Sequence, residues 1–242
     1  MSVWGKILGG VGGFAIGGPL GALIGAVAGH AVDKMRSGDS QSADSTKQVA
    51  FTIGVIVLGA KMAKADGVVT RDEVDAFKQV FRIPPDEMKN VGRLFNQARK
   101  DSHGFRPYAR QLGRTFEDNP QVLEELLDGL FHIARADGKV TEDEIEFLQE
   151  VAEIFGFKQA EWDRIRAANV GGQSADPYDI LGVRRDQSDA AIKAAHRKLV
   201  LENHPDRLVA QGMPQEFVDL ANEKLATINA AYDQIQLQRG RS

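Results

Sequence analysis

The chain has 242 residues and no cysteine, so it can bury one or two cores but cannot form a disulfide, a thiolate zinc site or a cysteine nucleophile. Its formal net charge of -4 at pH 7, without a basic patch interleaved with aromatic residues, excludes a general nucleic-acid-binding protein. No motif in the sequence indicates a cofactor, and we expect none.

The first predicted element is a membrane anchor over residues 1–36. From Ile7 to Val32 the chain carries no charged residue, and as a helix this stretch can cross a ~30 Å hydrocarbon core with some tilt. A secretory signal peptide has a shorter apolar run and a cleavage site. We therefore predict a single transmembrane helix at about 7–32, with a glycine-rich hairpin or interfacial segment as the alternative.

The anchor has a regular pattern of glycines, at Gly9, Gly13, Gly17, Gly21, Gly25 and Gly29. Small residues four positions apart let two helices approach closely in lipid, so the pattern predicts a homodimer formed through the anchor. Pro19 predicts a kink within this helix. Lys34, Arg36 and Lys47 outnumber Lys6, which favours a cytoplasmic location for the C-terminal side.

A polar stretch at residues 37–47 is interpreted as a flexible linker, and a helical domain follows at 48–168. Val49 to Ala60 is strongly apolar but short, which predicts a buried core helix rather than a second span. Further helices are expected from Pro84–Pro85 to about Lys100, from Arg106 to Phe116, from Asn119–Pro120 to Ala136, and from Lys158 to Ala168.

This domain contains an internal repeat, because the pattern of residues 61–74 recurs at residues 132–145. Both copies predict a helix, a turn and a second helix. In each copy a glycine ends the first helix, and a threonine with a glutamate three residues later forms a capping box: Gly67, Thr70 and Glu73, then Gly138, Thr141 and Glu144.

The acidic residues of the repeat also suggest a divalent-metal site, with Asp66, Glu73, Asp137 and Glu144 as weak candidates. They lack the alternating oxygen ligands and the spacing of an EF-hand loop, so helix capping is the favoured interpretation and metal binding the alternative. The lone histidines, His103 and His132, are interpreted as structural. The spacing and the repeated Ala-Asp-Gly-x-Val-Thr-x-Asp-Glu motif resemble the TerB (tellurite-resistance-like) helical domain over roughly 48–168, which implies an interaction module.

A short linker at 169–175 leads to the C-terminal domain, residues 176–242. Ser188 to Asn203 has a helical pattern that places Lys193 and Arg197 on one face, with Lys198 beside them. Pro205 cannot continue that helix, so the His204-Pro205-Asp206 triplet is expected in an exposed turn, where binding residues are often found.

Four separated blocks of this domain, 176–183, 192–199, 204–207 and 228–232, resemble the J domain of DnaJ-type co-chaperones. The resemblance implies a helical hairpin that docks on a DnaK-type Hsp70 and stimulates its ATPase. The implied docking residues are His204, Pro205 and Asp206 in the triggering turn, Lys193, Arg197 and Lys198 on the helix, and Arg207. The alternative is an ordinary helix–turn–helix with a solvated charged face. Unusual residues at His196 and Glu202-Asn203 are expected to weaken or tune docking.

The order of anchor, TerB-like domain and J-like domain resembles the membrane-anchored DnaJ-like co-chaperones of Gram-negative bacteria. This resemblance implies an all-α protein that is not itself an enzyme. It also implies a single-pass, dimeric protein of the inner membrane, with its bulk in the cytoplasm. The alternative function is a membrane-tethered stress-response or metal-binding scaffold with a J-like domain that stimulates no partner.

Overall fold

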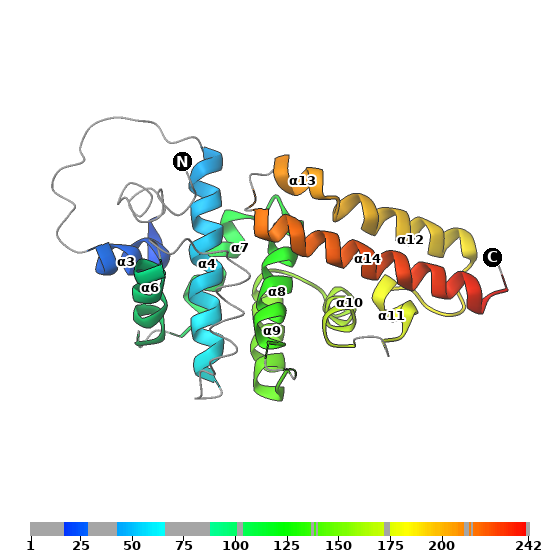
Figure 1. The fold of residues 1–242 in the computed structure, drawn as a ribbon, viewed down its shortest axis with the longest axis horizontal. Helices are drawn as coiled ribbons and strands as arrows, with labels where there is room; N and C mark the ends of the chain where they lie inside the picture. The colour runs from blue at the N-terminus through cyan, green and yellow to red at the C-terminus, as the bar shows by residue number, and fades with distance from the viewer. Residues whose placement is uncertain are drawn as a thin grey trace.

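The structure is a computed structural model that describes residues 17–28, 43–65, 88–100, 104–136, 138, 140–171, 175–210, 213 and 215–240. These residues form helices joined by turns and contain no strand, so the prediction of an all-α fold is confirmed (Figure 1). The helices are α3 (Gly18–Ala28), α4 (Ala43–Ala65), α6 (Met88–Lys100), α7 (Arg106–Thr115), α8 (Pro120–Ala134), α9 (Glu142–Ile154), α10 (Gln159–Val170), α11 (Pro177–Leu181), α12 (Asp189–Glu202), α13 (Pro205–Ala210) and α14 (Gln215–Gln238).

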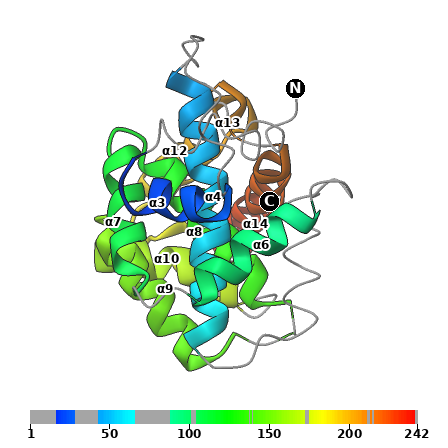
Figure 2. The same cartoon turned by 90° about the vertical axis from the view of Figure 1, so that its left-hand side faces the viewer.

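Helix α4 is the central element of the larger bundle, and α6, α7, α8 and α9 pack around it (Figure 2). Every side chain from Val49 to Ala63 is buried, which confirms the prediction of a core helix. The helix begins at Ala43, so the last residues of the predicted linker are helical.

The second copy of the repeat has the predicted caps. The hydroxyl of Thr141 accepts a hydrogen bond from the Glu144 backbone N–H at 3.2 Å, and the Glu144 carboxylate accepts one from the Thr141 backbone N–H at 2.8 Å. Gly138 has a φ of 94°, a left-handed conformation that suits a glycine after a helix. The first copy beyond residue 65 lies outside the described residues.

Most of the predicted membrane span lies outside the described residues, and the part within them differs from a single straight helix. Gly17 and Gly18 have φ values of 58° and 60°, and helix α3 begins at Gly18. Pro19 therefore stands in the first turn of α3, where proline is tolerated, and not at a kink in a longer helix. Among the described residues, no helix is both long and apolar enough to cross a membrane.

Helix α3 packs on the larger bundle. Leu20 and Leu23 are buried against its core, and the Gln111 side chain of α7 accepts a hydrogen bond from the Leu20 backbone N–H at 2.9 Å. Of the six glycines in the predicted ridge, Gly9, Gly13 and Gly29 lie outside the described residues. The ridge is therefore described only in part, and its role in self-association stays a prediction.

The C-terminal hairpin is formed by α12 and α14, which run side by side in Figure 1. Helix α12 has Ser188 as its N-cap and Asn203 as its C-cap, as the sequence predicted. A small second core lies beneath the hairpin, with Tyr178, Leu181, Ile192 and Ile228 among its buried residues.

The first half of α14 and the preceding α13 pack elsewhere, against the larger bundle. Leu208, Met213, Phe217, Val218 and Ala221 belong to the larger core and not to the small one. The C-terminal segment therefore divides its apolar side chains between two cores. This sharing was not predicted, because the sequence pattern shows which residues are apolar but not which bundle they contact.

Candidate docking surface

The His204-Pro205-Asp206 triplet lies where α12 ends and α13 begins. Pro205 ends α12 but occupies the first position of α13, where its missing N–H costs no hydrogen bond. The His204 ring Nδ1 accepts a hydrogen bond from the Asp206 backbone N–H at 3.2 Å, and so acts as a cap for α13. The expected turn is therefore the start of a short helix. The Asp206 side chain is 91% exposed and the His204 side chain is 48% exposed.

The basic residues predicted for docking lie on the exposed side of α12 and at α13. Lys193, Arg197, Lys198 and Arg207 are all exposed. Among the described residues, Lys193 and Arg197 form no ion pair, and Lys198 pairs with Glu202 at 3.7 Å. The structure thus leaves positive charge available to an external partner.

A shallow hollow of about 420 Å³ lies between α12 and α13, and its lining includes Arg207, the residue that follows the triplet. Arg197, Lys198 and Arg207 supply its positive charge, and Leu201 and Ala194 supply apolar surface. Leu201 of α12 is 59% exposed, and Val209 of α13 is 57% exposed. Exposed apolar side chains rimmed by charges are typical of a protein-binding surface.

His196 does not belong to this surface. Its ring stacks on Tyr232 of α14 with 4.2 Å between the ring centroids, and its Nε2 lies 2.8 Å from Asn229 Oδ1. His196 therefore joins the two helices of the hairpin. The register between α12 and α14 cannot be read from the sequence, so sequence analysis could not distinguish this role from docking.

The two residues before the triplet are also engaged within the chain. Asn203 is 2% exposed, and its side-chain amide donates to the Leu199 carbonyl at 2.8 Å. Glu202 is half-buried and pairs with Lys198. Asn203 thus completes the end of α12, and the unusual Glu202-Asn203 pair has an intramolecular structural role.

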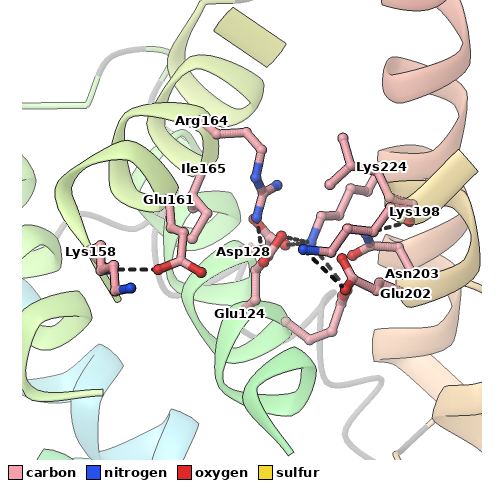
Figure 3. A network of polar contacts seen from close by, with 12 residues as sticks. Glu124, Asp128, Lys158, Glu161, Arg164, Ile165, Lys198, Glu202, Asn203 and Lys224 are labelled. Carbon is pink, nitrogen blue, oxygen red and sulfur yellow. Dashed lines mark hydrogen bonds and ion pairs between the residues drawn. The ribbon is translucent and has the colours of Figure 1, made fainter. Parts of the chain in front are cut away.

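A network of buried charges joins α14 to the larger bundle (Figure 3). Lys224 of α14 lies 2.5 Å from a Glu124 oxygen, 2.7 Å from an Asp128 oxygen and 3.3 Å from a Glu125 oxygen. Arg164 of α10 donates to the other Glu124 oxygen at 2.5 Å. Figure 3 shows Lys224 and Arg164 reaching the α8 carboxylates from two different helices.

Burial and charge act in opposite directions on the two neighbouring glutamates. Burial raises the pKa of Glu124, but attraction to Lys224 and Arg164 prevails and lowers that pKa to about 2. Burial raises the pKa of Glu125 to about 8, despite Lys224 and with a contribution from Asp128. Glu125 is therefore mainly protonated at neutral pH. Sequence reasoning missed this network, although charged residues within the buried face of α8 were its visible signal.

Of the four candidate metal ligands, the structure describes Glu144 alone. Asp66, Glu73 and Asp137 lie outside the described residues. Glu144 is buried, and its carboxylate accepts hydrogen bonds from the Thr141 backbone and hydroxyl, so it serves the helix cap. In the part of the chain that the structure describes, no group of three or more histidine and acidic side chains could hold a metal ion.

Three family models match the chain in succession. The model of the co-chaperone DjlA transmembrane domain matches residues 1–43, that of the tellurite resistance protein TerB matches 52–167, and that of the DnaJ domain matches 176–242. No solved structure matches the chain.

Several relatives that match along the whole chain are named Co-chaperone protein DjlA. The relative from Photobacterium profundum is 27% identical over 275 residues, covering 98% of this chain and 99% of its own. The relative from Coxiella burnetii is 29% identical over 264 residues, covering 97% of each chain, and that from Salmonella typhimurium is 27% identical over 268 residues, covering 99% of each. Because the three family models match in succession and these relatives align along the whole chain, the chain belongs to the DjlA-type family of co-chaperones.

Proposed function

We propose that this co-chaperone docks on a DnaK-type Hsp70 through α12 and the His204-Pro205-Asp206 triplet and stimulates ATP hydrolysis by that partner. The observation that carries the proposal is the hollow between α12 and α13, where Arg197, Lys198 and Arg207 surround exposed apolar surface beside the triplet. A cationic surface of this kind fits an acidic groove on a partner protein.

The two parts of the surface have different roles in this proposal. The exposed cations of α12 attract and orient the partner, because charge complementarity mainly sets encounter rate and register. The triplet delivers the signal, since His204 and Asp206 project from the start of α13 next to the hollow. The chain hydrolyses no ATP itself, and the partner performs the chemistry.

The test is single-turnover ATP hydrolysis by a bacterial DnaK-type Hsp70, with and without the full chain in lipid nanodiscs. We expect the full chain to raise the rate and the His204→Gln variant to leave it at the basal value. Lys89 of α6 is exposed and distant in sequence from the triplet, so Lys89→Gln serves as a control that retains stimulation. No stimulation by the folded full chain, or full stimulation by His204→Gln, would overturn the proposal.

We further propose that the N-terminal region anchors the protein in the bacterial inner membrane with one span and leaves the C-terminal bulk in the cytoplasm. The charge-free stretch at 7–32 and the basic residues after it support this orientation. A cytoplasmic reporter fused after residue 242 should be active, and a periplasmic reporter at the same place should be inactive. The reverse pattern would contradict the orientation.

Self-association through the glycine ridge completes the proposal. Replacing Gly21 and Gly25 by leucine introduces side chains where two backbones would meet in lipid. We expect crosslinked dimers in membranes to decrease in this variant, while replacement of Ala22 and Ala26 by leucine serves as the matched control. Equal crosslinking of both variants would exclude the ridge as the dimer contact.

A further inference from the structure

We propose that the TerB-like bundle positions the docking surface, because it holds the α13–α14 junction and thereby sets the position of the His204-Pro205-Asp206 triplet. Phe217 and Lys224 are the positioning residues, and neither belongs to the exposed surface. This inference rests on the proposed stimulation of Hsp70, although one of its tests below does not require that activity.

The first observation is that α13 packs against the larger core. Leu208 follows Asp206 by two residues and is fully buried in that core. The Met213 backbone N–H donates to the Leu208 carbonyl at 3.0 Å, and Met213 is buried in the same core. The helix that begins with Pro205 and Asp206 is therefore attached to the TerB-like bundle.

The second observation is the insertion of Phe217 at the start of α14. Its ring is fully buried and meets the ring of Phe51, on the central helix α4, edge to face with 4.6 Å between centroids. It also lies over Gly129 of α8, where an added Cβ would be 2.7 Å from Phe217 Cε1. A side chain larger than hydrogen at position 129 would displace the ring or the helix that bears it.

The third observation is that Lys224 continues the same contact along α14. It follows Phe217 by seven residues, or about two helical turns, so the two side chains lie on one face of the helix. Three carboxyl groups of α8, from Glu124, Glu125 and Asp128, surround its ammonium group. An ion pair in a buried network has directional requirements that an apolar contact lacks, so Lys224 fixes the register of α14 on α8.

These contacts divide the docking surface between two cores. The basic helix α12 buries Ile192 and Leu199 in the small core of the hairpin, whereas α13 buries Leu208 in the larger core. Helix α14 is common to both, since its first half joins the larger core and its second half joins the small one. The packing of α14 on α8 therefore determines the position of the triplet relative to the cations of α12.

Weaker packing of α14 on α8 changes the two parameters of the ATPase stimulation curve differently. The assay titrates this chain against a fixed amount of Hsp70. The cations of α12 stay in place, so the concentration of this chain that gives half-maximal stimulation changes little. The triplet is displaced from its productive position, so the maximal stimulation falls. A general loss of folded protein has the opposite signature, because fewer active molecules raise the half-maximal concentration and leave the maximum unchanged.

A pair of glycine variants tests the proposal in the full chain in nanodiscs. Gly129→Ala places a Cβ against Phe217, whereas Gly92→Ala, in α6, places one where no atom lies within 4 Å. Both changes raise helix propensity equally, so that effect cancels in the comparison. We expect a several-fold lower maximal Hsp70 ATPase stimulation for Gly129→Ala, and the wild-type maximum for Gly92→Ala. Lys224→Met, which alters the same contact by a different chemistry, should reproduce the lower maximum.

Hydrogen exchange supplies the second measurement. Backbone amides of residues 204–213 should exchange several-fold faster in Gly129→Ala and Lys224→Met, with amides of 192–199 unchanged. Wild-type exchange at 204–213 in both variants would overturn the inference, as would a raised half-maximal concentration with an unchanged maximum. If the wild-type chain stimulates no Hsp70, the proposed function fails, and faster exchange at 204–213 still supports the positioning.

Discussion

The cations of α12 and the single lysine of α14 differ in everything that surrounds them. The Lys198 side chain is 74% exposed with one carboxylate at 3.7 Å, whereas that of Lys224 is 8% exposed with three carboxyl groups at 2.5–3.3 Å. A charge in water interacts weakly with its neighbours and stays available to a partner, while a buried charge depends on its carboxylates. In this domain the exposed cations of α12 are available for a partner, whereas the buried lysine of α14 attaches the domain to the TerB-like bundle.

The largest expected effect comes from removing the buried cation. Lys224→Met leaves the carboxylates of Glu124 and Asp128 buried without their ammonium partner, so the free energy of unfolding should fall by roughly 3–5 kcal/mol. Urea unfolding of the full chain at pH 7 measures this change. Lys193→Met is the matched control on the exposed face and should change stability by less than ~0.5 kcal/mol. Equal losses in the two variants would erase the distinction between the two sets of cations.

Glu125 gives the next effect, through pH. The folded-state pKa of Glu125 is about 8, against an ordinary value of 4.5. The stability that its protonated form contributes is therefore fully present below pH 4.5. That stability declines as the pH rises through about 8. Glu125→Gln cannot ionise, so the variant should gain roughly 1–3 kcal/mol relative to wild type between pH 5 and pH 9.

Urea unfolding at pH 5, 7 and 9 measures the Glu125 effect. The lowered pKa of His132, caused first by its burial, also affects this range but is common to both proteins and cancels in their difference. The pKa of Glu124 is lowered to about 2, so the stability that Glu124 contributes is lost only in acid, below the range compared. A difference that is constant with pH would show that Glu125 is ionised throughout.

A smaller effect is expected on the opposite side of α12. His196→Ala removes the stack on Tyr232 and should lower stability by ~0.5–1.5 kcal/mol. Its half-maximal concentration for Hsp70 stimulation should match the wild type, because His196 faces α14 and not the hollow. Weaker docking by folded His196→Ala would mean that the docking surface extends around α12.

The smallest effect on stability is expected at the exposed cations, where the functional effect is large. Lys193→Glu should leave the free energy of unfolding within ~0.5 kcal/mol of the wild-type value. It should raise several-fold the concentration of this chain that gives half-maximal stimulation of Hsp70. Lys89→Glu makes the same change in net charge on α6 and should leave docking unchanged. The difference between the two variants should shrink at high salt, since salt screens exposed charges. Identical curves for both variants would exclude α12 as the docking helix.

The positions of the proposed docking residues were predictable because the information that sets them is local. Pro205 ends a helix wherever it occurs, and Lys193 and Arg197 share a helix face by their spacing alone. The capping box of Thr141 and Glu144 was predictable for the same reason, since its atoms lie within one turn. The roles of His196 and Asn203 were not, because each depends on a contact or a degree of burial that local sequence does not specify.

By itself the sequence determined the all-helical class, the order of the three regions, the bounds of α12 and the residues of the triplet. These follow from hydrophobic periodicity, helix-capping residues and helix-breaking residues within short stretches of chain. Only the tertiary structure decided that Leu208 and Phe217 bury in the TerB-like core and that Lys224 meets Glu124. Such contacts join residues a hundred or more positions apart, as in the pairs Lys224–Glu124 and Phe217–Phe51, and many apolar or charged partners would satisfy the same local pattern. Which partner is chosen depends on how the whole set of helices packs together.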